Sequence, residues 1–157
     1  MTWRAAVLTV SDRSARGERP DASGPLLAGL LRELGLRVDD PVVVPDEIQA
    51  VQEAVRAAAS SYDLVVTTGG TGLSPRDVTP EAVAPLLDRQ VPGIAEALRS
   101  RNAAAVPTAV LSRGVAGTIG TTLVVTLPGS TGGVRDGIAV LAEVLEHALA
   151  QLRGDDH

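Results

Sequence analysis

Short β-branched runs alternate along the chain with longer segments of helical period, and this alternation predicts its secondary structure. Residues 4–10 (RAAVLTV) predict a first strand. Leucines then recur at helical spacing up to Gly35, which predicts the end of a first helix. Residues 36–44 predict a second strand, and Asp46 follows at an N-cap position. The next helix carries its apolar residues along one face: Ile48, Val51, Val55 and Ala58.

The second half of the chain predicts three more strands and three more helices. Residues 62–67 (YDLVVT) form the clearest strand. Thr79 and Pro80 indicate a helix start, because a capping hydroxyl precedes a proline at the first helical position. Further strands are expected at residues 108–113 (TAVLSR) and 121–128 (TTLVVTLP). The remaining helices are expected over residues 92–104 and, as one long amphipathic helix, from Val134 to Leu152.

The order of these elements predicts the fold class. Strands that alternate with helices are typical of a parallel sheet joined by right-handed crossovers. The length of 157 residues suits one domain, and Trp3 and Tyr62 are the only aromatic residues, so the core must be aliphatic. We therefore expect an α/β fold, a three-layer α/β/α sandwich with a mostly parallel sheet, formed by a single domain over residues 1–157.

Composition excludes several kinds of chemistry. All 14 basic residues are arginine and there is no cysteine, which excludes lysine-dependent phosphate loops, Schiff bases and thiolate chemistry. His147, on the predicted C-terminal helix, and His157, the last residue, favour packed or solvated positions over catalysis. The net charge of -5 and the scarcity of aromatics argue against nucleic acid as a partner. Because no apolar run resembles a signal peptide or a membrane span, we expect a soluble cytoplasmic protein without a membrane partner.

Two glycine-rich loops follow predicted strands and are candidate anion sites. Glycines let successive backbone N–H groups converge on an anion, although an ordinary tight turn explains glycines alone equally well. The carboxyl ends of parallel strands share one edge of a sheet, where open α/β folds bind ligands. Two loops at that edge favour a ligand with more than one phosphorylated part. The first loop, TGGTG, comprises Thr68, Gly69, Gly70, Thr71 and Gly72, and the second, PGSTGG, includes Gly129 and Ser130.

Three aspartates lie beside these loops in the predicted fold. Asp12 follows the first strand, Asp46 follows the second, and Asp77 comes just beyond TGGTG. Carboxylates near phosphates are explained if a cation lies between them, and Mg²⁺ takes one or two carboxylates plus substrate phosphate oxygens. Taken singly, an Asx-turn, an N-cap and a turn residue are adequate alternatives. Their joint placement at one edge favours a functional site.

Several motifs carry a family resemblance over nearly the whole chain. The chain resembles the MogA and gephyrin G-domain family of molybdopterin adenylyltransferases, which includes plant G-domains. The long TGGTG…RDVTPEA string is specific, whereas LSR or LPG alone is weak, and RDVTP resembles this branch more than the related MoaB branch. Relatives often carry LPGNP or LPGQP where this chain has LPGST. The motifs are SDR (11–13), DASGP (21–25), VPDE (44–47), TTGGTGLSPRDVTPEA (67–82), PGIAEALR (92–99), LSR (111–113) and LPGS (127–130).

The resemblance implies an activity and a set of site residues. The family transfers AMP from Mg-ATP to the terminal phosphate of molybdopterin and releases pyrophosphate, in molybdenum-cofactor biosynthesis. Its catalytic carboxylates fall on Asp46 and Asp77, and we expect Asp46 to hold Mg²⁺. Ser112 of LSR is implicated in substrate or nucleotide handling. The other expected substrate-binding residues are Asp12, Thr68, Gly69, Gly70, Thr71, Gly72, Gly129 and Ser130.

The implied partners are molybdopterin, ATP as co-substrate, further copies of the chain in a homotrimer, and a protein that inserts molybdenum. Two other readings of the same loops stay open. One is a non-catalytic molybdopterin carrier or scaffold, and the other is a hydrolase in which water replaces the pterin phosphate. The pair Asp46 and Asp77 disfavours the carrier, because a passive anion binder has no need of carboxylates beside phosphate.

Overall fold

A seven-stranded sheet forms the centre of the protein, whose computed structural model describes residues 2–155. Its strands are β1 (Arg4–Val10), β2 (Arg37–Val38), β3 (Val42–Val44), β4 (Leu64–Thr68), β5 (Arg89–Gln90), β6 (Ala116–Ile119) and β7 (Thr122–Leu127). They lie in the order β2-β1-β4-β7-β6-β5, and β3 also pairs with β1. β1, β2, β3, β4 and β7 are parallel, whereas β6 and β5 add an antiparallel edge.

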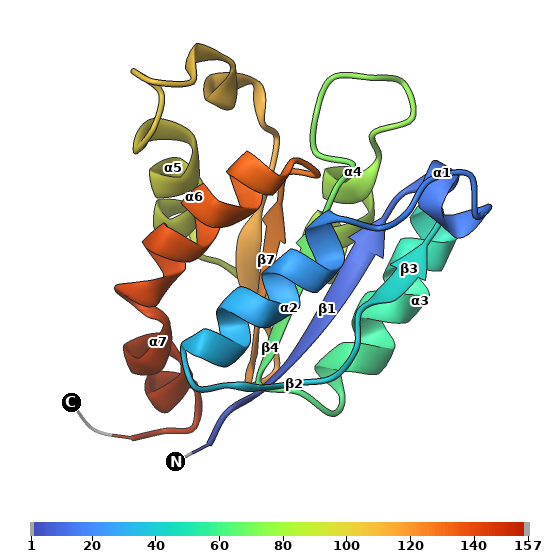
Figure 1. The fold of residues 1–157 in the computed structure, drawn as a ribbon. Helices are drawn as coiled ribbons and strands as arrows, with labels where there is room; N and C mark the ends of the chain where they lie inside the picture. Colours follow the sequence, from blue (N-terminus) through green and yellow to red (C-terminus); the bar gives the residue numbers. More distant parts are fainter. Residues whose placement is uncertain (1, 156–157) are drawn as a thin grey trace.

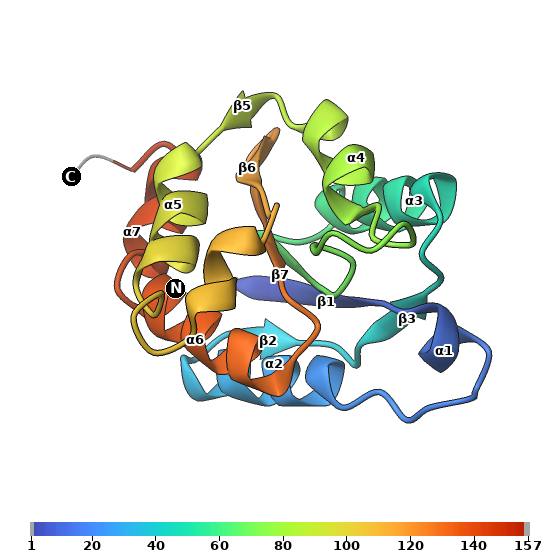
Figure 2. The same ribbon diagram turned by 90° about the horizontal axis from the view of Figure 1, so that it is seen from above.

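Helices cover both faces of this sheet (Figures 1 and 2). One face carries α2 (Ser23–Glu33), α5 (Pro92–Ser100), α6 (Thr131–Ala142) and α7 (Leu145–Leu152), and the other carries α3 (Ile48–Ala59) and α4 (Thr79–Val83). The short helix α1 (Asp12–Ala15) follows β1, and two 3₁₀ helices are η1 (Ala84–Leu86) and η2 (Pro107–Leu111). The predicted three-layer α/β/α sandwich with a mostly parallel sheet is confirmed.

The core is aliphatic, as the composition requires. Every residue of the central strands β4 and β7 is buried, because both faces of a parallel sheet are covered by helices. Strand residues alternate between two apolar clusters, so Val66 packs with α2 and α6 whereas Val65 packs with α3. Trp3 is the one aromatic residue among the buried core residues of the described chain.

The strand predicted at residues 108–113 is wrong. The segment forms η2 and the turn after it, and Val110 and Leu111 are 59% and 50% exposed rather than in the core. Pro107 opens this 3₁₀ helix, and the next strand, β6, comes later in the chain and pairs antiparallel with β7. The apolar composition of this segment suits a strand, but Ala109 and Leu111 line a cavity wall instead of a sheet face.

Other boundaries differ from the prediction in smaller ways. Residues 36–44 form two short strands, β2 and β3, and the long C-terminal helix is divided into α6 and α7 near Val144. The helix predicted over 92–104 ends at Ser100. Gly35 ends α2 with φ of 96°, as predicted. No helix within residues 2–155 is both long and apolar enough to cross a bilayer, and His157 lies outside the described residues.

Candidate active site

The two glycine-rich loops lie side by side at the carboxyl edge of the sheet, the upper end in Figure 1. β4 and β7 are parallel neighbours, with Thr68 opposite Leu127, so the loops that follow them meet. Gly69 N–H donates to the Leu127 carbonyl at 3.0 Å, and the Thr68 hydroxyl donates to the Pro128 carbonyl at 2.8 Å. The predicted adjacency of the loops is confirmed, and Thr68 holds them together from a fully buried position.

The TGGTG loop requires glycine at its centre. Gly69 and Gly70 have φ of 105° and 71°, a left-handed conformation that side chains disfavour. A Cβ at Gly70 would lie 2.3 Å from Thr79 Oγ1 and 3.1 Å from Asp46 Oδ1. Val78 is the N-cap of α4, so Thr79 is its first helical residue. The Thr79 hydroxyl donates to the Gly69 carbonyl at 2.9 Å. The predicted capping function of Thr79 is therefore wrong, and its hydroxyl fixes the loop instead.

Both loops present backbone donors. The N–H groups of Gly70, Thr71 and Gly72 donate to no acceptor within residues 2–155, and neither do those of Gly129 and Ser130. The Ser130 side chain caps α6 by accepting from Gly133 N at 3.0 Å. Free N–H groups in a glycine loop and at a helix start attract anions, because their partial positive charges point outward.

Two hydrogen bonds join Asp46 and Asp12, which follow β3 and β1. Asp12 N–H donates to Asp46 Oδ2 and Asp46 N–H donates to Asp12 Oδ1, both at 2.9 Å. Asp46 does not cap α3, whose N-cap is Glu47, so that prediction is wrong. Its second oxygen, Oδ1, faces Gly70 and has no hydrogen bond within the described residues. The Asp46 carboxylate thus keeps one oxygen for a ligand beside the glycine loop.

The two carboxylates differ in electrostatics. Burial raises the pKa of Asp46, and the nearby charges of Asp12 and Asp77 raise it further against the Asp12 N–H hydrogen bond. Burial raises the pKa of Asp12 as well. The ion pair with Arg76 and the hydrogen bond from Asp46 N–H have the larger combined effect, so the pKa of Asp12 is lowered. Arg76 thus pairs directly with the charge of Asp12, whereas Asp46 has no ion-pair partner among the described residues and lies near the negative charges of Asp12 and Asp77.

Asp77 lies beside Gly72, at the end of the TGGTG loop. Its Oδ2 accepts from Ser74 N at 3.1 Å, and a Cβ at Gly72 would lie 2.9 Å from that oxygen. The Asp77 carboxylate therefore flanks Gly72 as Asp46 flanks Gly70. The fold brings the two predicted catalytic aspartates to the same glycine-rich loop.

Arg113, the last residue of the LSR motif, fixes this arrangement. Its Nε donates to the Gly72 carbonyl and its Nη2 to the Asp77 carbonyl, both at 2.8 Å. Its Nη1 pairs with Glu81 Oε2 at 2.6 Å, and its own N–H donates to the Thr71 carbonyl at 2.8 Å. The Arg113 guanidinium thus joins Gly72 and Asp77, the two ends of the segment that carries the Asp77 carboxylate, through contacts between residues 36 or more positions apart.

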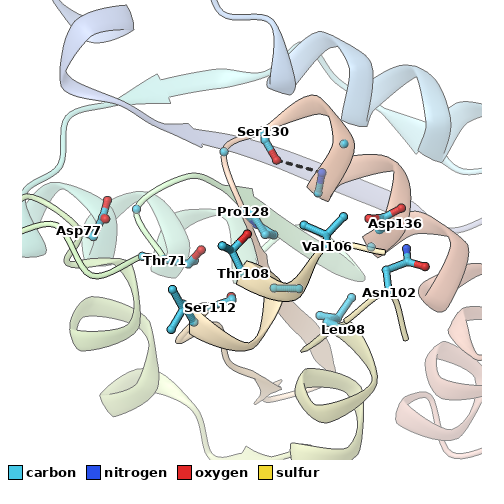
Figure 3. Close-up of a pocket in the computed structure, with 18 residues that line it drawn as sticks. Thr71, Asp77, Leu98, Asn102, Val106, Thr108, Ser112, Pro128, Ser130 and Asp136 are labelled. Atoms are coloured by element: carbon cyan, nitrogen blue, oxygen red, sulfur yellow. Dashed lines mark hydrogen bonds between the residues drawn. The ribbon is translucent and has the colours of Figure 1, made fainter. Parts of the chain in front are cut away.

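A cavity of about 510 Å³ opens between the two loops, η2 and the start of α6 (Figure 3). This volume suits a small organic ligand. Seven of the predicted site residues line it: Gly70, Thr71, Gly72, Asp77, Ser112, Gly129 and Ser130. Four others, Asp12, Asp46, Thr68 and Gly69, lie outside its lining, although Asp46 Oδ1 lies beside Gly70, which is part of the lining.

Part of the cavity was not predicted from the sequence. Asn102, Thr108 and Asp136 contribute polar groups, and Leu98 and Val106 contribute apolar surface. The sequence predicts a strand over residues 108–113, and a strand buried in the sheet would not line a cavity. Asp136 could have been found from its position one and a half turns into the helix that follows PGSTGG, since that places it on the loop side of α6.

The aspartates fit a magnesium site that is completed by substrate. No three His, Cys, Asp or Glu side chains gather as a metal cluster in the described part of the chain. Mg²⁺ needs no such cluster where one or two carboxylates and phosphate oxygens bind it together. The open Oδ1 of Asp46 and the raised pKa of that residue are what a cation would relieve.

These features define an α/β protein with a ligand cavity between two glycine-rich loops at the carboxyl edge of its sheet, where such folds bind phosphorylated ligands. Residues 6–147 match the model of the family described as "Probable molybdopterin binding domain". The chain belongs to this family, whose members include proteins named MogA, MoaB and gephyrin.

Individual relatives match the chain almost from end to end. It is 38% identical over 157 residues to the "Molybdopterin adenylyltransferase" of Pyrococcus furiosus, covering 97% of this chain and 92% of that one. Among solved structures, a molybdopterin biosynthesis protein from Mycobacterium abscessus is 51% identical, with a TM-score of 0.91 and 97% of each chain covered. MoaB from Thermus thermophilus is 44% identical, with a TM-score of 0.92 and 98% of each chain covered. The chain spans only 50%, 48% and 22% of the length of three larger curated relatives.

Proposed function

We propose that this protein is a molybdopterin adenylyltransferase, which transfers AMP from Mg-ATP to the terminal phosphate of molybdopterin and releases pyrophosphate. The observation that carries the proposal is the placement of Asp46 beside Gly70 and of Asp77 beside Gly72, in one glycine loop with free N–H groups. A passive anion binder gains nothing from two carboxylates beside its phosphates. The name of the Pyrococcus furiosus relative agrees with this activity.

The reaction requires two anions to approach each other. Two unit charges about 4 Å apart repel by roughly 4 kcal/mol at an effective dielectric constant near 20, and phosphates carry more than one charge. The N–H groups of Gly70, Thr71 and Gly72 would bind one set of phosphate oxygens, and those of Gly129 and Ser130 another. Both sets are preorganised, because the Thr68 hydroxyl donates to Pro128 of the second loop and the Thr79 hydroxyl donates to Gly69 of the first, so they act without rearrangement.

Asp46 would hold Mg²⁺ through Oδ1, and Asp77 would align the nucleotide or the attacking phosphate. The cation, when bound, neutralises phosphate charge and orients the α-phosphate. The phosphate monoester of molybdopterin is already ionised near neutral pH, so no histidine or lysine base is needed. The chain's contribution is thus positioning and charge stabilisation. Ser112, whose Oγ accepts from Gly114 N at 3.3 Å, can donate its hydroxyl into the cavity.

Pyrophosphate release from Mg-ATP, measured with and without molybdopterin, tests the proposal. The wild type should release pyrophosphate only with molybdopterin present. Asp46→Asn and Asp77→Asn should each lower the rate by about 10²–10³-fold while molybdopterin still binds. Glu47→Gln is the matched control, because that exposed carboxylate makes no side-chain cap hydrogen bond.

The same assay separates the other two readings. Tight molybdopterin binding without pyrophosphate from the wild type would identify a carrier. ATP consumption without molybdopterin would identify a hydrolase, with water as the acceptor. Either result would refute adenylyl transfer.

A further inference from the structure

Arg76 is held beside the TGGTG loop with part of its donor capacity unused. Its Nε and Nη2 both donate to Asp12 Oδ2, with the Nε contact at 2.8 Å. Its Nη1 donates to no acceptor within residues 2–155, and the side chain is 65% exposed. A guanidinium has more N–H donors than this contact uses, so the others are available to a ligand.

Asp12 and the turn that carries Arg76 hold the guanidinium near Asp46. Asp12 exchanges two hydrogen bonds with Asp46, so the carboxylate that binds Arg76 is tied to the one proposed to hold Mg²⁺. The charge of Arg76 acts to lower the pKa of Asp46, so the guanidinium lies within electrostatic range of that carboxylate. The turn is fixed because Ser74 N–H donates to Asp77 Oδ2 at 3.1 Å and Asp77 N–H donates to the Ser74 carbonyl at 2.9 Å. Arg76 is therefore oriented before any ligand arrives.

The ion pair of Arg76 and Asp12 lies away from the cavity. Figures 1 and 2 show α1, which begins at Asp12, and residues 102–112 on opposite sides of the loop between β4 and α4. Residues of the 102–112 segment line the cavity, whereas Arg76 and Asp12 lie outside its lining. In phosphate transfer the attacking and leaving oxygens lie roughly in line, on opposite sides of the phosphorus. An acceptor phosphate that enters from the cavity therefore directs the leaving group toward Asp12 and Arg76.

We propose that Arg76 binds the β- and γ-phosphates of ATP and stabilises pyrophosphate as it leaves. An oxygen of the acceptor phosphate forms a bond to the α-phosphorus. The bond from the α-phosphorus to the oxygen that bridges it to the β-phosphate breaks, and that bridging oxygen takes the electron pair. Pyrophosphate thus gains negative charge beside a guanidinium, whose planar donors match phosphate oxygens. The inference rests on the proposed function and extends it, because it makes Arg76 a catalytic residue and assigns the side on which the leaving group departs.

Equilibrium binding tests this contact without any turnover. Pyrophosphate and AMP are titrated separately into the wild type and Arg76→Gln by calorimetry, in the presence of Mg²⁺. Arg76→Gln should weaken pyrophosphate binding about 10- to 100-fold, since charge-assisted hydrogen bonds are lost. AMP lacks the β- and γ-phosphates, so its affinity should stay within about twofold, which also shows that the variant is folded. Arg16→Gln is the matched control and should change neither affinity, because Arg16 also acts on the pKa of Asp12 but pairs with Glu18 at 2.9 Å.

A double variant separates contact with pyrophosphate from mere neutralisation of Asp12. Asp12→Asn removes the carboxylate that Arg76 neutralises. If Arg76 contacts pyrophosphate, Asp12→Asn with Arg76→Gln should bind pyrophosphate more weakly than Asp12→Asn alone. Equal affinities of these two variants would show that Arg76 serves only Asp12, and the proposal would fail.

Two ATP analogues test the stabilisation of the leaving group itself. A methylene group in place of the β,γ-bridging oxygen gives a more basic leaving group than a difluoromethylene group does. Arg76→Gln should therefore slow turnover of the methylene analogue by the larger factor, because that reaction depends more on the guanidinium. Equal factors for the two analogues would contradict this role.

The binding and turnover assays also keep the two proposals apart. Unchanged pyrophosphate affinity in Arg76→Gln, in a protein that transfers AMP, would overturn the role of Arg76 alone. Pyrophosphate binding that depends on Arg76, in a protein that releases no pyrophosphate from ATP and molybdopterin, would leave the contact standing and refute adenylyl transfer.

Discussion

Asp12 and Asp46 accept each other's backbone N–H groups at 2.9 Å, although 34 residues separate them in the chain. These two hydrogen bonds join the carboxyl ends of β1 and β3 and leave Asp46 Oδ1 directed at Gly70. Asp12 thus positions Asp46, and Arg76 compensates the charge of Asp12 from outside. The carboxylate proposed to bind Mg²⁺ is fixed by backbone contacts, so its placement does not depend on a flexible partner.

Substitutions of Asp12 should separate geometry from charge. Asp12→Asn keeps an oxygen that can accept from Asp46 N–H, whereas Asp12→Ala leaves that N–H without its acceptor. We expect Asp12→Ala to lower the free energy of unfolding by about 1–3 kcal/mol and Asp12→Asn by distinctly less. Urea denaturation measures both, and equal losses would show that the charge of Asp12 matters rather than its hydrogen bond.

Gly70→Ala should be among the most damaging substitutions of the glycine loop. The new Cβ would meet Thr79 Oγ1 at 2.3 Å in addition to the strain of φ at 71°. Gly120→Ala is the matched control, because Gly120 also has a positive φ of 57° but open space around it. We expect about 1 kcal/mol of destabilisation for Gly120→Ala and at least twice that for Gly70→Ala, measured by thermal unfolding. Similar losses of stability in Gly70→Ala and Gly120→Ala would show that the Thr79 side chain moves away from the new methyl group.

Arg113 should affect catalysis through the position of Asp77. Arg113→Lys keeps the charge but cannot donate at once to the Gly72 carbonyl, the Asp77 carbonyl and Glu81. We expect its pyrophosphate release to fall about 10- to 100-fold, mainly in kcat, because the loop that carries Asp77 loosens. Glu81→Gln keeps both carbonyl contacts and should remain near wild-type activity. A wild-type kcat in Arg113→Lys would contradict this positioning.

The pair of Glu81 and Arg113 should make a small, pH-dependent contribution to stability. The hydrogen bond from Arg113 lowers the pKa of Glu81 below its ordinary value of 4.5, against an opposing effect of burial. A lowered pKa means that the stabilisation is present above pH 4.5 and is lost as the pH falls through the folded-state pKa. Because both side chains are partly exposed, we expect a difference in the free energy of unfolding of about 0.2–1 kcal/mol between wild type and Glu81→Gln at pH 7. This difference should fall as the pH is lowered below 4.5, and a difference that does not change on acidification would exclude the ionised pair as its source.

The parts of the fold that were predicted correctly depend on local pattern. β1 matches residues 4–10 because consecutive β-branched and aliphatic residues suit a strand buried on both faces. The position of the TGGTG loop at a strand end follows from its glycines and from the strand before it. These signals lie within a few residues of the element they specify.

The parts that were missed depend on contacts between distant segments. Asp46 appeared to be an N-cap because nothing near it in the chain indicates that Asp12 takes its hydrogen bond. Residues 108–113 have the composition of a strand, but β6 already occupies the place beside β7, and β5 forms the edge of the sheet. Nothing in the chain next to Asp136 indicates the segment Asn102 to Ser112, whose residues line the same cavity.

Two adjacent threonines of β4 should respond in opposite ways to the same substitution. Both are fully buried, but the Thr68 hydroxyl donates to the Pro128 carbonyl at 2.8 Å whereas the Thr67 hydroxyl has no hydrogen-bond partner among the described residues. Thr67→Val replaces an unsatisfied hydroxyl by a methyl group of similar size, so we expect stability to rise by up to about 1 kcal/mol. Thr68→Val removes the hydrogen bond between the two glycine-rich loops and should cost about 1–3 kcal/mol. Denaturation of both variants provides the comparison, and a loss in Thr67→Val as large as that in Thr68→Val would mean that a buried water satisfies the Thr67 hydroxyl.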